Sequence, residues 1–224
     1  MRKALAAVAI GALSLAASSS ASAAEISISP EKRCYRSGEE GLTLNGSGFT
    51  PNGEVSVTLN GSFLGPGLPD ATGAFTGDLS LRQDNGRARR TYTATDTTDP
   101  TLTASTEILV SEVDVVLRPR NGAPGRRLEI DADGFTTGRT LWAHVKKGRR
   151  VRNIKIGRLK GACRSLVAKR QLLPRDAGVG LYVVQFDTFR RYKSTRPVKV
   201  GYTITVRRVF RPSAASAFTW RRSF

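Results

Sequence analysis

Hydrophobic and polar residues alternate with period two in short runs along most of the chain. Val55, Val57 and Leu59 form one such run, and Leu141, Ala143 and Val145 form another. The runs are rich in Val, Ile, Thr, Phe and Tyr, and Asn-Gly pairs often separate them. This alternation is typical of β-strands with one buried face, and Asn-Gly favours tight hairpin turns. Apart from the N-terminal apolar run, no segment keeps a helical period, so the sequence predicts an all-β protein.

The pattern occurs twice along the chain. Residues 44–50 parallel residues 130–136, and residues 92–96 parallel residues 182–187. The two offsets, 86 and 90 residues, correspond to one domain length. The sequence therefore predicts a leader, two copies of one fold and a tail, spanning residues 1–24, 25–112, 113–209 and 210–224. In the second copy the expected strands span residues 113–118, 127–133, 140–146, 151–156, 164–172, 181–186 and 198–209.

Several segments are similar to bacterial secreted immunoglobulin-like domains. Residues 46–53 and 70–75 resemble the passages from strand B to C and from strand D to E of such domains. Tyr182, preceded by Gly178 and Gly180, is similar to the tyrosine corner that opens strand F, and Tyr92 is a looser match. The resemblance implies two tandem immunoglobulin-like β-sandwiches. It implies little about function, because such modules serve as adhesins, carbohydrate binders, spacers and enzyme appendages.

The N-terminus has the pattern of a secretory signal peptide. Arg2 and Lys3 precede an apolar run from Ala4 to Ala17, and a small-residue cleavage site ends at Ala23. A membrane anchor is the alternative, but a spanning helix needs about 20 apolar residues. We therefore expect a secreted protein of the cell envelope, with no transmembrane segment after cleavage.

Charge is distributed very unevenly between the two copies. The chain has 36 Lys and Arg against 18 Asp and Glu, but residues 25–112 hold 7 against 12 and residues 113–224 hold 27 against 6. Because strand direction alternates in a sandwich, three loops of the second copy should meet at the pole far from the first copy. Their basic residues are Arg120, Arg126, Arg127, Lys146, Lys147, Arg149, Arg150 and Arg175.

Such a cluster raises the local potential and attracts polyanions. We expect it to bind an anionic envelope polymer or a protein partner, and a merely solvated basic surface remains the alternative. Export argues against genomic nucleic acid as the partner. A second interpretation of the whole chain is a structural or protein-interaction module, in which acidic and basic copies dock or self-associate.

A second basic group lies in one loop of the second copy. It interleaves Phe189 and Tyr192 with cations, as nucleic-acid platforms do. Strand direction places this loop at the end that faces the acidic copy, so we expect interdomain docking rather than ligand binding. The cations are Arg190, Arg191, Lys193 and Arg196.

The two cysteines permit one internal disulfide. The same direction rule places Cys34 and Cys163 at facing ends of the two copies, so we expect a Cys34–Cys163 bond that clamps the tandem. Free thiols or an intermolecular bond are the alternatives.

Candidate catalytic chemistry is scarce. The chain has one His and two Cys, too few for a metal site built from several such ligands. His144 lacks a serine and carboxylate arrangement, and no glycine-rich phosphate loop precedes a helix. We therefore predict a protein that is not an enzyme and has no catalytic residues, metal or cofactor. We expect residues 210–224, basic and aromatic, to form a frayed tail.

Overall fold

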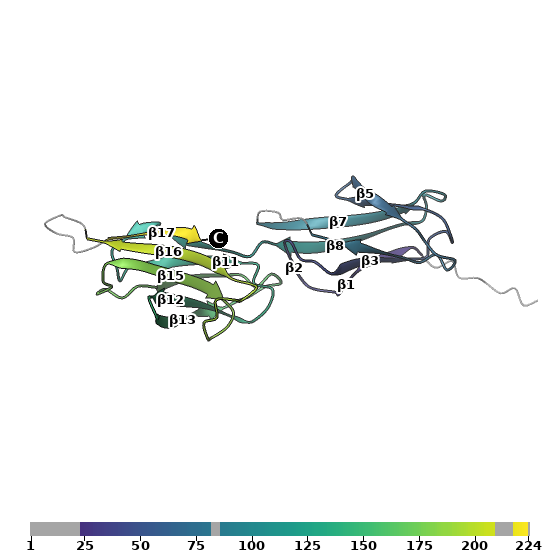
Figure 1. The fold of residues 1–224 in the computed structure, drawn as a ribbon. Helices are drawn as coiled ribbons and strands as arrows, with labels where there is room; N and C mark the ends of the chain where they lie inside the picture. The colour runs from purple at the N-terminus through teal and green to yellow at the C-terminus, as the bar shows by residue number, and fades with distance from the viewer. Residues whose placement is uncertain (1–22, 82–85, 209–216, 224) are drawn as a thin grey trace, which may run out of the picture.

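The computed structural model describes residues 23–81, 86–208 and 217–223, and within these residues the chain forms strands and no helix. The prediction of an all-β protein is therefore confirmed. The strands form two lobes that lie end to end (Figure 1), a first lobe up to residue 112 and a second lobe from residue 113 onward. The predicted leader, residues 1–24, lies outside the described residues except for its last two.

The first lobe contains eight strands in two sheets. One sheet has the order β1-β3-β6 and the other the order β2-β8-β7-β4-β5. In chain order the strands are β1 (Glu25–Ser29), β2 (Tyr35–Arg36), β3 (Leu42–Ser47), β4 (Val55–Leu59), β5 (Ser62–Gly67), β6 (Phe75–Leu79), β7 (Arg87–Asp96) and β8 (Thr103–Ser111).

Alternating side chains from both sheets meet between them. Ile28 and Leu44 come from the first sheet, and Val57, Tyr92 and Ala94 come from the second. All five are buried, because every second residue of a strand points to the same face. The first lobe is therefore a β-sandwich with its own hydrophobic core.

The second lobe is built in the same way, with a larger sheet. Its sheets have the orders β14-β11-β9 and β10-β17-β16-β15-β12-β13. The strands are β9 (Asp114–Arg118), β10 (Asn121–Gly122), β11 (Arg127–Asp133), β12 (Thr140–Lys147), β13 (Arg150–Arg158), β14 (Leu166–Gln171), β15 (Gly180–Asp187), β16 (Val200–Arg207) and β17 (Ala217–Ser223).

A second core fills the space between these sheets. Ile130, Phe135, Phe186 and Ile204 are completely buried within it. The seven strands expected for residues 113–209 correspond to β9, β11, β12, β13, β14, β15 and β16 with end shifts of at most two residues. Tyr182 Oη donates a hydrogen bond of 2.9 Å to the carbonyl of Gly178, as the tyrosine-corner prediction requires.

The expectation of a frayed tail is wrong for residues 217–223. They form β17, which pairs with β16 from Ala217 to Ser223 and also with β10. Phe218 is buried in the second core, and the Trp220 ring lies 4.9 Å from the Tyr202 ring in a T-shaped contact. Trp220 Nε1 also donates to the carbonyl of Pro119, at 3.1 Å. Burial of the Phe218 ring and packing of the Trp220 ring against the second core are the physical reason that the segment is ordered.

The two lobes approach closely at Gly134, which follows β11. Its φ of +74° is a left-handed conformation that favours glycine. A Cβ atom at this position would lie 2.0 Å from the carbonyl oxygen of Glu112, in the link between the lobes. The link therefore packs directly on the end of the second lobe.

Candidate anion-binding surface and lobe junction

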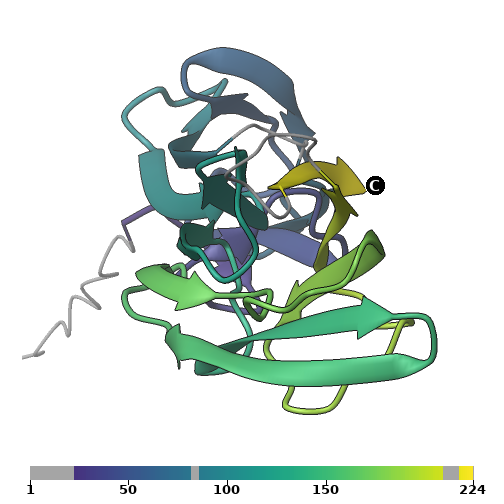
Figure 2. The same ribbon diagram turned by 90° about the vertical axis from the view of Figure 1, so that its left-hand side faces the viewer.

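Three loops of the second lobe meet at its far pole, which Figure 2 views end-on. The Gly125 amide donates to the carbonyl of Leu173 at 3.1 Å, so the loop after β10 touches the loop after β14. Lys147 Nζ, at the end of β12, donates to the carbonyls of Gly178 and Val179 at 3.1 and 3.2 Å. The structure thus brings together the three loops on which the predicted cations lie.

Six of the eight predicted cations are arginines, all exposed at this pole, and none of them forms an ion pair with another residue that the structure describes. Arg127 also donates to the carbonyl of Lys169, at 3.1 Å, which leaves its charge in place. The six are Arg120, Arg126, Arg127, Arg149, Arg150 and Arg175.

The two lysines of the predicted set already contact other groups of the second lobe. Lys147 Nζ donates to two carbonyls and to Tyr182 Oη, and it lies 4.8 Å from the centre of the Tyr182 ring. Lys146 is half-buried on the outer face of its sheet, 5.9 Å from the centre of the Tyr192 ring. Lys147 therefore holds a loop, and Lys146 lies beside the pole rather than on it.

Sequence reasoning missed two further cations at this pole. Because β16 runs toward the pole, Arg207 at its end and Arg208 after it lie there, and both are exposed. Asp176, in the loop after β14, is the acidic residue on these loops. The pole therefore carries a clear excess of positive charge within the described residues.

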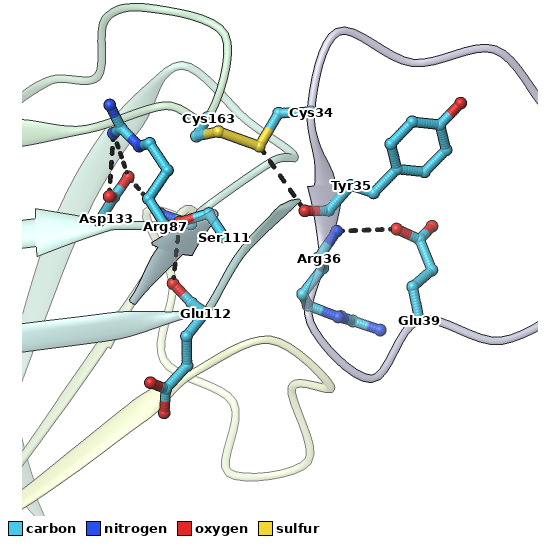
Figure 3. Close-up of a disulfide and its surroundings, with 10 residues drawn as sticks. Cys34, Tyr35, Arg36, Glu39, Arg87, Ser111, Glu112, Asp133 and Cys163 are labelled. Atoms are coloured by element: carbon cyan, nitrogen blue, oxygen red, sulfur yellow. Dashed lines mark hydrogen bonds and ion pairs between the residues drawn. A yellow bond between two sulfur atoms is a disulfide. The ribbon is translucent and has the colours of Figure 1, made fainter. Parts of the chain in front are cut away.

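The cysteine prediction is confirmed: Cys34 and Cys163 form a disulfide that joins the two lobes (Figure 3), and their Cα atoms lie 5.1 Å apart. Beside it, Arg87 Nη2 of the first lobe contacts both carboxylate oxygens of Asp133 of the second, at 2.8 and 2.9 Å. This ion pair runs against the net charges, because the acidic lobe supplies the cation. A second contact, between Arg222 Nη2 of the second lobe and Glu112 Oε1 at 3.9 Å, follows the net charges. The junction therefore rests on a covalent bond and two local ion pairs.

The basic loop between β15 and β16 packs on its own lobe. The guanidinium of Arg196 lies 3.7 Å from the centre of the Phe189 ring, and the Lys193 carbonyl accepts a hydrogen bond from Gln185 Nε2 at 3.0 Å. Among the residues that the structure describes, Arg190, Arg191, Lys193 and Arg196 form no ion pair with the first lobe. Their expected docking on that lobe remains a prediction that no contact supports.

A buried polar network anchors this loop. His144 and Asp187 are completely buried, and His144 Nε2 lies 3.1 Å from Asp187 Oδ1. His144 Nδ1 contacts Asn153 Oδ1 at 2.7 Å, and Asp187 accepts the Phe189 amide at 2.8 Å. Both ring nitrogens of His144 therefore have an acceptor.

Each of the two groups favours the charged form of the other. Burial opposes the charge on His144, but the hydrogen bonds to Asp187 and Asn153 outweigh it and raise the pKa of His144 above its ordinary value. Burial likewise opposes ionisation of Asp187, but the hydrogen bonds from His144 and Phe189 lower its pKa. Because both side chains are completely buried, the pair holds the loop in place rather than forming a solvent-accessible acid–base site.

Neither a metal-binding cluster nor a membrane-spanning helix occurs within the described residues. No group of three or more His, Cys, Asp or Glu side chains lies close enough there to hold a metal ion. In the same residues no helix has the length and apolar character needed to cross a membrane.

No protein-family model matches the chain, and no curated protein matches it. Among solved structures, the crystal structure of β-glucuronidase from Parabacteroides merdae is similar over 88% of this chain, with 10% sequence identity and a TM-score of 0.27. The chain spans 24% of that enzyme's length. A likeness this weak assigns neither a fold family nor an activity.

Proposed function

We propose that this chain is a secreted, non-enzymatic protein of two tandem immunoglobulin-like β-sandwiches, whose second lobe binds an anionic polymer of the cell envelope or extracellular space. Export of residues 25–224 after cleavage of a signal peptide is part of the proposal. The paired sheets, the repeated order of strands and the hydrogen bond from Tyr182 to Gly178 support the fold. The disulfide between the lobes supports an oxidising compartment.

The observation that carries the binding proposal is the meeting of three arginine-bearing loops at the far pole. Guanidinium groups present several donors in a planar fork that matches carboxylate and phosphate oxygens. Because these groups are exposed, each contact with a polymer contributes little, and affinity comes from many contacts that salt weakens. A polymer with repeating negative charges can make many such contacts at once, whereas a single small anion can make only a few.

The test compares two triple variants with the same change in charge. One is Arg126→Ser, Arg149→Ser and Arg150→Ser at the pole, and the control is Arg139→Ser, Lys155→Ser and Arg158→Ser, exposed cations away from it. We expect the pole variant to bind immobilised polygalacturonate or long-chain polyphosphate about tenfold more weakly at low salt, since three exposed contacts sum to roughly 1.4 kcal/mol. Equal affinities of the two variants would show that the pole is only a solvated surface.

A second candidate, a protein-interaction module, is favoured by one surface of the first lobe. Phe63 and Leu64 on the edge strand β5, with Leu68 after it, are 69%, 48% and 73% exposed, and exposed apolar edge strands are prone to pair with other chains. Light scattering across ionic strength separates the mechanisms. Self-association that fades with salt indicates docking between acidic and basic lobes, whereas association that persists in salt indicates this apolar edge.

A further inference from the structure

A second concentration of positive charge lies at the opposite end of the second lobe, where the lobes meet. An open cleft of about 920 Å³ lies beside the disulfide. Arg33 and Arg36 line it from the first lobe, and Arg164, Thr136 and Thr137 line it from the second. Neither lobe alone forms this cleft.

The charge of the cleft is only partly compensated. Its lining contains four cationic side chains and one carboxylate, Glu39. Lys32 forms an ion pair with Glu39, whose other oxygen accepts the Arg36 amide at 3.0 Å. In the described part of the chain the side chains of Arg33 and Arg164 have no ion-pair partner, so the cleft has net positive charge inside a concave surface, which focuses the potential.

The disulfide determines the spacing of those two arginines. Arg33 precedes Cys34 and Arg164 follows Cys163, and the cysteine Cα atoms are 5.1 Å apart. Because consecutive Cα atoms are separated by 3.8 Å, the arginine Cα atoms lie at most about 13 Å apart. Two arginine side chains at this spacing can contact one small anion from both lobes.

The loop that carries Arg164 is tightly fixed. Lys160 and Ser165 pair across it with backbone hydrogen bonds of 2.9 and 2.8 Å, and Arg164 has a φ of +57°. This left-handed conformation is uncommon for a residue with a side chain. The hydroxyls of Thr136 and Thr137 add neutral donors on the same side of the cleft.

We propose that this cleft is a second anion site, which binds a compact multivalent oxyanion and is formed only while the Cys34–Cys163 bond is intact. Without that bond, the lobes are held at this place by the link near Gly134 and by two partly exposed ion pairs, Arg87 with Asp133 and Arg222 with Glu112. An exposed ion pair contributes little, so the two walls of the cleft would separate. The site is independent of the far pole and does not rest on the polymer binding proposed above.

Calorimetric titration of the full chain with tripolyphosphate tests the proposal, and citrate in a parallel titration distinguishes phosphate from carboxylate recognition. We expect Arg33→Ser with Arg164→Ser to weaken binding at least tenfold. The matched control, Arg139→Ser with Arg158→Ser, removes the same charge outside the cleft and should bind like the unaltered chain. The pole triple variant should also bind tripolyphosphate normally.

The requirement for the disulfide is tested with the double variant Cys34→Ser and Cys163→Ser, measured in the same buffer without reductant as the unaltered chain. We expect both lobes to keep their fold by circular dichroism and binding to fall as far as in the arginine pair variant. If the cysteine variant does not fold, Arg33→Glu in the disulfide-bonded chain replaces it, and this variant should abolish binding.

Four results would overturn the proposal: no binding by the unaltered chain, equal binding by the arginine pair variant, undiminished binding by a folded cysteine variant, or undiminished binding by Arg33→Glu. If the unaltered chain binds tripolyphosphate but does not bind the polymer, only the proposed function of the pole is refuted.

Discussion

The two lobes end corresponding strands with a buried aspartate, but they satisfy it in different ways. Asp96 ends β7 and Asp187 ends β15, and both side chains are completely buried. Asp96 accepts backbone amides from Thr50 and Thr98 at 2.8 Å and from Asp99 at 3.1 Å. Asp187 accepts one backbone amide and two side-chain donors, from His144 and Gln185.

The two lobes differ in whether a hydrogen-bond donor to the buried aspartate can change its charge. Burial opposes the charge on Asp96, but its amide donors outweigh this and lower its pKa to about 2. Those donors do not titrate, so the anchor of the first lobe is constant at neutral pH. In the second lobe the partner is a histidine, the side chain that changes charge nearest neutral pH. One position in a repeated fold thus gives a fixed anchor in one lobe and a titratable anchor in the other.

Removing each aspartate should have the largest effect and tests the comparison directly. We expect Asp187→Ala to lower the free energy of unfolding of the second lobe by about 3–5 kcal/mol, because it removes one partner of a completely buried hydrogen-bonded pair. Asp96→Ala should cost the first lobe less, about 2–3 kcal/mol, since water can reach the part-buried amides that lose their acceptor.

Each lobe can be followed separately during urea unfolding. Both tryptophans, Trp142 and Trp220, belong to the second lobe, so their fluorescence monitors that lobe, and amide hydrogen exchange monitors the first. Asp131→Ala is the control, since Asp131 is half-exposed and its carboxylate lies 3.7 Å from the Arg118 guanidinium. Equal losses in the two lobes would contradict the distinction between their anchors.

The edges of the two larger sheets differ as well. In the first lobe β2 pairs in parallel with β8, whereas in the second β17 lies between β10 and β16. We expect Trp220→Ala to destabilise the second lobe by about 2–3 kcal/mol, less than for a fully buried tryptophan, because the ring is half-buried. Trp142 fluorescence measures the loss, and the exposed neighbour Thr219→Ala should have almost no effect. An unchanged unfolding midpoint for Trp220→Ala would mean that the Trp220 ring adds no stability to the second lobe.

The smallest expected effect is on pH dependence. Because the folded-state pKa of His144 is raised, its stabilising contribution is complete below its unfolded value, about 6.5, and is lost as pH rises through the folded value. For Asp96 the contribution is complete above 3.8 and is lost as pH falls toward about 2. Asp187, whose pKa is also lowered, adds an acid-side loss in the second lobe.

Urea unfolding followed by tryptophan fluorescence between pH 5 and pH 9 measures the histidine contribution. The unaltered second lobe should become less stable with rising pH, and His144→Gln should flatten that dependence. If the stability of the His144→Gln variant falls with pH as steeply as that of the unaltered chain, another group causes the pH dependence.

Most of the strands could be predicted from the sequence, because alternation of side chains across a sheet is a local property. The disulfide followed from strand direction, which places Cys34 and Cys163 at facing ends whatever their separation in sequence. β17 was missed because Phe218 and Trp220 make only a short alternation, and their burial depends on Tyr202 and Pro119 of distant segments.

The candidate sites were only partly predictable. Strand direction identified the loops of the pole, but it could not show that Lys147 is used to hold the loop before β15. His144 and Asp187 are 43 residues apart, and no local pattern joins them. The cleft did have a signal, since Arg33 and Arg164 flank the two cysteines. This pattern predicts a shared site only if the two cysteines pair, because the disulfide brings the two arginines close together.

The bond between Cys34 and Cys163 also alters how the chain would respond to tension. The two residues are separated by 129 positions, and this stretch includes most of the first lobe, the link and strands β9 to β13 of the second lobe. A force applied through the ends passes across the sulfur atoms and bypasses everything between them. Roughly 40 nm of extended polypeptide, at about 3.4 Å per residue, would stay shielded while the rest of the second lobe is stretched.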